Sequence, residues 1–138
     1  MRLIFSILSI AYIAGIFLFA DSSVVSTLSS FNPYSLLHIP LYGILTFLLI
    51  FSFMPLKFNP TNQKNQINQI NQRNFYLIPG GIALIVAIAD EIHQAYVPGR
   101  DASITDVLLD LAGITLVLFI VLYFYGKQKI IKADPLIP

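Results

Sequence analysis

The chain lacks cysteine and tryptophan and carries few charged residues. Without cysteine it can form no disulfide, and no thiolate is available as a nucleophile or a metal ligand. Only 11% of its 138 residues are charged, against about 25% in ordinary soluble domains, whereas 57% are hydrophobic. It has no glycine-rich phosphate motif and no basic patch interleaved with aromatic residues, so nucleic acid is not an expected partner. The composition indicates a small all-α membrane protein.

Four nearly uncharged runs are long enough to cross a bilayer, which takes about 20 apolar residues. These runs cover residues 3–20, 34–54, 75–97 and 102–125. The first run follows Arg2 and has a rival interpretation as a secretory signal, but its 18 residues exceed the usual signal core of about 7–15. We therefore expect an uncleaved first helix and a single domain, residues 1–138, built as a bundle of four transmembrane helices.

The connections between the runs differ in composition. Residues 56–74 are polar and repetitive, with Asn-Gln pairs recurring about every three residues. Such a segment buries little apolar surface, so we expect a flexible loop without a function of its own. Pro40 predicts a distortion in the first turns of the second run. Pro98-Gly99 predicts the end of the third run, and the tail from Asp134 is expected not to fold.

The positively charged residues predict how the chain is oriented. Seven of the eight Lys and Arg residues fall on one side of a four-span arrangement, and Arg100 alone falls on the other. Because positively charged loops remain in the cytoplasm, both termini and the loop at 56–74 are expected there. Residues 90–110 would then lie close to the outer face of the membrane.

Polar side chains interrupt three of the four runs at a similar depth. Five of the seven acidic residues fall between Asp90 and Asp110. At a rise of 1.5 Å per residue, the polar positions lie roughly 6–12 Å below the outer boundary, and spacings of three or four residues align them on one face of each helix. Ionisable groups at such a depth are costly and suggest a function. The predicted ligand-binding residues are His38, Tyr42, Glu91, Gln94, Asp106 and Asp110, with Arg100 in the turn above them.

A purely structural interpretation of these residues stays open, in which they form a hydrogen-bond network that holds three helices together. Asp90 and His93 lie on other faces of the third run, where we expect solvation at the membrane interface. Asp101 is expected to be a solvated loop charge or the N-cap of the fourth helix. The acids and His38 would suit a divalent ion, but no recognised metal-binding spacing is present, so we predict no metal site and no cofactor.

Two motifs resemble the VanZ-like family. The signature of that family is similar to this chain's Glu91-x-x-Gln94-x-x-x-Pro98-Gly99-Arg100 followed by Asp106-x-x-x-Asp110-x-x-Gly113. The family's other motif is similar to this chain's His38-x-x-x-Tyr42. Ser22-Ser23 after the first run also fits. The chain departs from the pattern where Tyr34 and Ser35 replace the usual Asp-Lys, and where Asp110 replaces the usual Asn.

The resemblance implies a multi-pass protein of a bacterial cytoplasmic membrane. The namesake of the family accompanies glycopeptide resistance genes and is linked to teicoplanin resistance without an assigned reaction. No reaction can therefore be carried over to this chain, and the sequence leaves open whether it is an enzyme. The departures at Tyr34, Ser35 and Asp110 remove a cation and add an anion, so this chain is expected to differ from the family in the charge of what it binds.

Three functions follow from these observations. We favour an outward-facing pocket that binds a lipid headgroup or a cell-envelope component, with an effect on teicoplanin susceptibility. The alternative is an intramembrane enzyme that acts on a lipid or lipid-linked substrate, with His38 or Glu91 as general base beside Asp106 and Asp110. A transport or proton-relay role is disfavoured because no polar residues continue towards the cytoplasmic half. The expected partners are membrane lipids and a lipid-linked or glycopeptide ligand, and a homo-oligomer is left open.

Overall fold

A computed structural model describes residues 2–20, 34–53, 67–98 and 102–133, which are helical apart from short turns and contain no strand. The elements are α1 (Arg2–Phe19), the 3-10 turn η1 (Tyr34–Leu37), α3 (His38–Phe53), α4 (Ile67–Gln94) and α5 (Ile104–Ala133). Four of these helices are long and apolar enough to cross a membrane. The predicted all-α architecture with four candidate spans is therefore confirmed.

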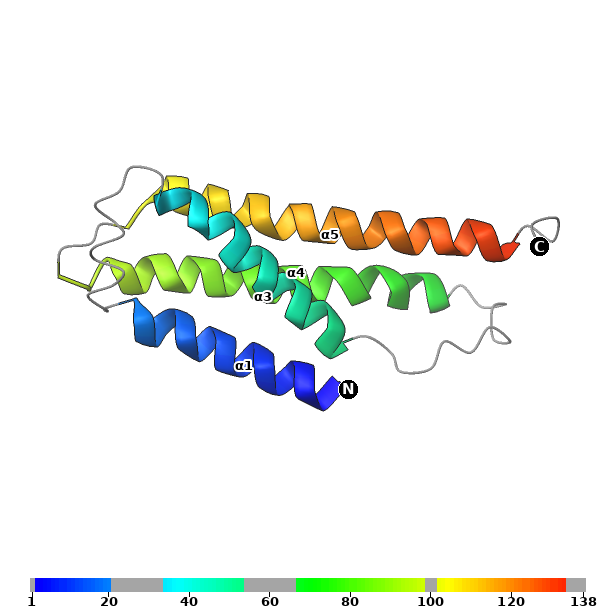
Figure 1. Cartoon of the computed structure of the whole chain (residues 1–138), viewed down its shortest axis with the longest axis horizontal. Helices are drawn as coiled ribbons and strands as arrows, with labels where there is room; N and C mark the ends of the chain where they lie inside the picture. The colour runs from blue at the N-terminus through cyan, green and yellow to red at the C-terminus, as the bar shows by residue number, and fades with distance from the viewer. Residues whose placement is uncertain (1, 21–33, 54–66, 99–101, 134–138) are drawn as a thin grey trace.

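Successive helices run in opposite directions along one bundle (Figure 1). Helices α1 and α4 end where α3 and α5 begin, at the left of the figure, and we name this the polar end. Helices α1 and α4 begin, and α3 and α5 end, at the opposite end. The arrangement brings His38, Gln94 and Asp106 to the same end, although they are far apart in the sequence.

Helix α3 lies at the centre of the bundle and packs most closely against α5. A Cβ atom added to Gly113 of α5 would overlap the carbonyl oxygen of Ile39 on α3. A Cβ atom added to Gly43 of α3 would lie in ordinary van der Waals contact with Val117, at 3.4 Å, and with the carbonyl oxygen of Gly113, at 3.7 Å. Small residues at a helix crossing let the two backbones approach and gain van der Waals contact. The core below this crossing contains Tyr42, Leu45, Leu49, Ala83, Ala87 and Ile114.

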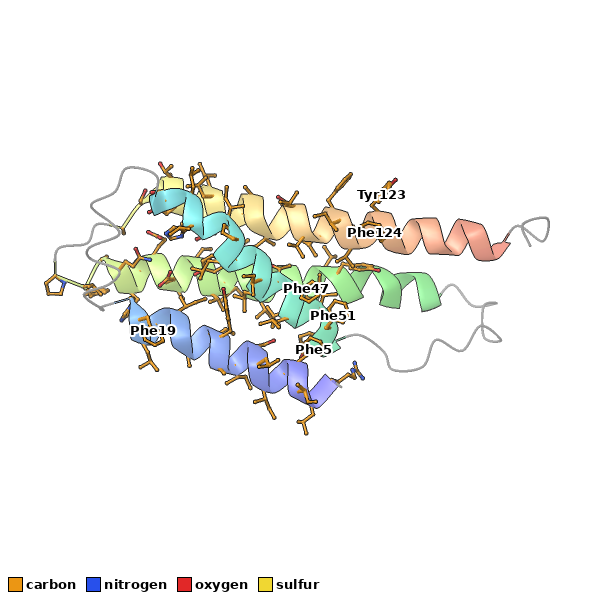
Figure 2. The ribbon with its side chains drawn as sticks, in the orientation of Figure 1. Phe5, Phe19, Phe47, Phe51, Tyr123 and Phe124 are labelled. Carbon is orange, nitrogen blue, oxygen red and sulfur yellow. The ribbon has the colours of Figure 1, made fainter. Side chains whose placement is uncertain are left out.

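Helix α1 lies at the edge of the bundle, and Ser9 is its only buried residue. Polar contacts attach it to α3 along one seam: Arg2 Nη2 donates to Phe53 O at 2.7 Å, and the hydroxyls of Ser6 and Ser52 are 2.6 Å apart. The contact of Arg2 places a positive charge on the last carbonyls of α3, where the helix dipole favours it. Aromatic side chains from both helices gather beside this seam at the opposite end of the bundle (Figure 2).

Two helices extend beyond the predicted spans, and one loop prediction is wrong in part as a result. Helix α4 begins at Ile67, so the predicted flexible loop 56–74 is helical over residues 67–74, whereas 54–66 lie outside the described residues. Helix α5 continues to Ala133, eight residues beyond the end of the predicted span at 125, while its candidate membrane span, Ile104–Phe124, agrees with the prediction. Once a helix has formed, each added residue gains a hydrogen bond at little cost, so a polar segment can extend an apolar helix.

The helix boundaries predicted near Pro98 and Pro40 agree better with the structure. Helix α4 ends at Gln94, and the turn towards Pro98 is closed by bonds from Tyr96 N to His93 O and from Val97 N to Gln94 O, both 3.0 Å. Pro40 lies in the first turn of α3, where a backbone N–H has no partner within the helix, and the 3-10 turn η1 precedes it. These short turns fix the positions of the polar side chains at the helix ends.

Candidate functional site

The close approach of α3 and α5 creates the first contact of the site. Because Gly113 meets Ile39, the neighbouring His38 comes within reach of Asp110, which lies nearly one turn before Gly113 on α5. His38 Nδ1 and Asp110 Oδ1 are 2.8 Å apart. The side chain of Asp110 is fully buried and His38 is 4% exposed. The close approach of α3 and α5 at Gly113 thus holds the imidazole of His38 against the carboxylate of Asp110 inside the protein.

A second contact joins α3 to α4 through Asp90. Tyr42 Oη donates a hydrogen bond to Asp90 Oδ2 at 3.2 Å, and Gln94 Nε2 donates to the same oxygen at 3.0 Å. Asp90 is 3% exposed, so the expectation that it is solvated at an interface is wrong. Helix α4 packs against neighbours on more than one side, and adjacent positions of the helix therefore both become buried. The i, i+4 spacing of Asp90 and Gln94 was the signal in the sequence that could have identified this pair.

Glu91 connects α4 to the start of α5. Its Oε2 accepts a hydrogen bond from Ser103 N at 2.8 Å, one residue before α5 begins, where the positive end of the helix dipole favours a carboxylate. Ser103 O also accepts from Asp106 N and Val107 N, so Ser103 occupies the N-cap position. Asp101, the other predicted N-cap, lies outside the described residues. Glu91 Oε1 is buried and finds no hydrogen-bond partner within the described parts of the chain.

Asp106 completes the group on the side of His38 that faces away from Asp110. Its Oδ2 lies 4.0 Å from His38 Nε2, and its side chain is 15% exposed. Every predicted ligand-binding residue that the structure describes therefore lies at the polar end, together with Asp90, which the sequence interpretation left out. The predicted Arg100 lies outside the described residues. We name this group the polar cluster: His38, Tyr42, Asp90, Glu91, Gln94, Asp106 and Asp110.

His93 does not join the polar cluster. It is half-buried and its ring meets the edge of Phe17 on α1, with ring centroids 5.5 Å apart. Its Nδ1 is buried and has no hydrogen-bond partner among the residues that the structure describes. The expectation of solvation is therefore only partly correct for His93, because one face of the imidazole packs on an apolar helix.

A pocket of about 380 Å³ opens beside the polar cluster, between α1, α3 and α4. His38, Asp90 and Gln94 form its polar wall. Its apolar wall comes largely from α1 and consists of Ala11, Tyr12, Gly15, Ile16, Phe19, Ala20 and, from α3, Leu41. A Cβ atom on Gly15 would meet only Phe19, at 4.0 Å, so the space in front of Gly15 is open. The pocket can therefore hold a molecule with a polar head and an apolar body.

The polar cluster has an unusual charge composition. It contains four carboxyl groups and one imidazole, and the helices that the structure describes bring no Lys or Arg to this end. The basic residues of those helices belong to the first turns of α1 and α4 and the last turns of α5, at the opposite end: Arg2, Arg73, Lys127, Lys129 and Lys132. Carboxylates removed from water are costly unless a positive group or hydrogen-bond donors compensate them. This end of the bundle is thus suited to a cationic or hydrogen-donating ligand.

No model of a known protein family, no curated protein and no solved structure matched this chain. The chemistry of the site is therefore derived from the geometry of the chain itself.

Proposed function

We propose that this chain is an integral membrane protein that binds the amine-bearing headgroup of a lipid in the pocket beside the polar cluster. The carrying observation is the composition of the pocket, which has Asp90 and Gln94 on one wall and apolar side chains of α1 on the other. A primary ammonium donates three hydrogen bonds and carries one positive charge, which suits a group of carboxylates to which the described helices bring no Lys or Arg. The acyl chains would lie along the exposed apolar faces of the helices.

Membrane insertion is supported by the outward-facing side chains of all four candidate spans. Leu18 of α1 and Phe119 of α5 are 76% and 69% exposed, which is favourable only where hydrocarbon surrounds the bundle. The basic residues at the end opposite the polar cluster favour an orientation with both termini in the cytoplasm. In that orientation the pocket is at the outer leaflet of a bacterial cytoplasmic membrane.

The resemblance to the VanZ-like family supports a role at the cell envelope. Five of the residues that carry it belong to the polar cluster, namely His38, Tyr42, Glu91, Gln94 and Asp106, whereas Asp110 of the cluster stands where the family has Asn. Binding of an envelope lipid at the outer leaflet would alter the access of lipoglycopeptides such as teicoplanin to their target. A host that expresses the chain is therefore expected to show changed teicoplanin susceptibility, and the change should disappear when the pocket is filled.

The test is lipid retention measured by native mass spectrometry of the purified protein. The protein is exchanged into mixtures of phosphatidylethanolamine, phosphatidylcholine and phosphatidylglycerol with identical acyl chains. We expect phosphatidylethanolamine to be retained at least fivefold over the other two, since only its headgroup has a primary ammonium. Equal retention of all three lipids would contradict the proposed ligand chemistry.

A matched pair of variants on α1 tests the location. Gly15→Leu extends a side chain into the open space of the pocket, whereas Ala14→Leu adds the same side chain at an exposed position one residue away. Gly15→Leu should abolish the preference for phosphatidylethanolamine and the teicoplanin phenotype, and Ala14→Leu should change neither. If both variants behave like the unmodified protein, the ligand does not occupy this pocket.

A second function, an intramembrane enzyme, is favoured by one specific observation. The contact between His38 Nδ1 and Asp110 Oδ1 is the arrangement that orients an imidazole as a general base, and His38 also lines the pocket. Hydrolysis or transfer on a bound lipid would then depend on His38. Incubation of the protein with a bacterial lipid extract, followed by mass spectrometry of the products, distinguishes turnover from binding alone. Products formed by the protein and absent with His38→Gln would favour the enzyme.

A further inference from the structure

Three side chains from three helices direct potential metal ligands towards one another. His38, Glu91 and Asp106 each offer one ligand atom, and these atoms lie within 4.8 Å of one another. Donors around a tetrahedral zinc ion, with bonds of about 2.0–2.2 Å, are about 3.3–3.6 Å apart. Small side-chain rotations, without movement of the helices, would therefore bring the three donors onto one ion. Each of the three residues comes from a different helix, so metal binding would join α3, α4 and α5.

The imidazole of His38 is already oriented for metal binding. Its Nδ1 lies 2.8 Å from Asp110 Oδ1, and its Nε2 lies 4.0 Å from Asp106 Oδ2. In metalloproteins a ligating histidine almost always donates its other ring N–H to a carboxylate or a carbonyl, which fixes the tautomer and strengthens the ligand. Asp110 therefore has the position of an outer residue that orients a ligand and does not itself bind the ion.

Glu91 supplies an independent indication of a missing ligand. The residue is 5% exposed, and its Oε2 is occupied by Ser103 N. Its Oε1 is buried without a hydrogen-bond partner among the described residues, an arrangement that costs free energy unless a cation or proton compensates it. Because Glu91 is a member of the group of three donors, a metal ion there would satisfy this oxygen.

We propose that His38, Glu91 and Asp106 form a binding site for a divalent transition-metal ion of the zinc type. One nitrogen and two oxygen donors favour zinc over magnesium and calcium, which take oxygen ligands almost exclusively. The ion would neutralise part of the acidic charge of the polar cluster and leave a coordination position for water or for an anionic group of a ligand. The inference does not rest on the proposed binding of an amine headgroup, since Glu91 and Asp106 do not line the lipid pocket and only His38 belongs to both sites.

The experiment is zinc binding by the full chain, purified in detergent, freed of its affinity tag and stripped with a chelator. Isothermal titration with ZnCl₂ should show one saturable equivalent per chain, and a 100-fold excess of MgCl₂ should not displace it. Zinc should also raise the melting temperature, since a ligand that binds only the folded state stabilises it. The absence of saturable zinc binding would overturn the proposal.

Isosteric variants identify the ligands. Asp106→Asn is the decisive variant, because Asp106 is partly exposed and its removal should not disturb the fold. It should weaken zinc binding at least tenfold, as should Glu91→Gln, and Asp110→Asn should weaken it while leaving the stoichiometry at one. His93→Gln, which removes the other histidine of the chain, is the matched control and should bind zinc normally. Unchanged affinity in Asp106→Asn would overturn the assignment even if Glu91→Gln failed to fold.

The pocket variant separates this proposal from the proposed lipid binding. Gly15→Leu fills the lipid pocket from α1 and is not part of the group of three donors. It should therefore bind zinc with unchanged affinity while it loses the preference for phosphatidylethanolamine. Asp106, in turn, does not line the pocket, so Asp106→Asn in metal-free protein should retain the lipid preference. These two variants therefore show the failure of one proposal independently of the other proposal.

Discussion

The two ends of the bundle are held together by different kinds of contact. At the polar end, buried ionisable side chains meet across helices, as His38 meets Asp110 at 2.8 Å. At the opposite end, aromatic rings pack between α1 and α3: the centroids of Phe5 and Phe51 are 5.2 Å apart, and those of Phe47 and Phe51 are 4.6 Å apart (Figure 2). The first arrangement is directional and costly to disturb, whereas the second tolerates changes of shape.

This difference favours the polar end as the place where the proposed ligand binds. At the opposite end, aromatic packing and the hydrogen bonds of Arg2 and Ser6 hold α1 against α3 with no buried carboxylate among the described residues there. The buried carboxylates of the polar end add a desolvation cost that the packing does not require. A cost of this kind is expected at a binding or catalytic site and not in a scaffold. Substitutions at the two ends should therefore differ in size and in whether they affect ligands.

The largest effect is expected at the crossing of α3 and α5. Gly113→Ala places a methyl group against the carbonyl of Ile39, so the two helices must separate and His38 must move away from Asp110. We expect the free energy of unfolding to fall by about 3 kcal/mol, at the upper end for overpacked cores. Gly81→Ala is the control, because no atom lies within 4 Å of the added methyl. Unfolding in a series of sodium dodecyl sulfate concentrations measures both, and equal stability of the two variants would contradict the close crossing.

The next largest effect is expected from loss of the partner of His38. Asp110→Ala leaves a buried imidazole without its acceptor and should cost about 2 kcal/mol. Asp110→Asn keeps an oxygen at the same place and should recover more than half of that loss. The same unfolding measurement compares the two variants. If Asn were no better than Ala, the hydrogen bond would not be the reason for the stability.

A smaller effect is expected from the bond between Tyr42 and Asp90. Tyr42→Phe removes only the hydroxyl that donates to Asp90 Oδ2, and a hydrogen bond between membrane helices contributes about 0.6–1 kcal/mol. A double-mutant cycle with Asp90→Asn isolates the interaction from the other partner of Asp90, which is Gln94. A coupling free energy of zero would show that the two side chains act independently.

The smallest effect is expected at the aromatic end. Phe51→Leu removes the ring contacts with Phe5 and Phe47 but keeps most of the apolar volume, so it should cost about 0.5–1 kcal/mol. Zinc affinity and lipid preference, measured as above, should be unchanged because the polar end is remote. A change of either property with Phe51→Leu would show that the two ends are not independent.

Much of this architecture could be predicted from the sequence because hydrocarbon-length runs leave few alternatives. The shared depth of His38, Glu91 and Asp106 followed from helix rise alone, and the structure brings these residues together. The role of Asp90 could not be derived in this way, since it depends on which sides of α4 are covered by neighbours. The extension of α4 to Ile67 was also missed, because composition does not record how readily an existing helix continues into a polar segment.

The position of the apolar core has an electrical consequence. Below the polar cluster the interior is filled by side chains such as Leu45, Leu49 and Ala83. These apolar side chains separate the ionisable groups of the polar cluster from the opposite end of the bundle. In an inserted bundle this apolar core would act as an electrical insulator between the polar cluster and the far side of the membrane. A single chain could then concentrate negative charge near one surface, and load or release cations there, without conducting protons or dissipating the membrane potential.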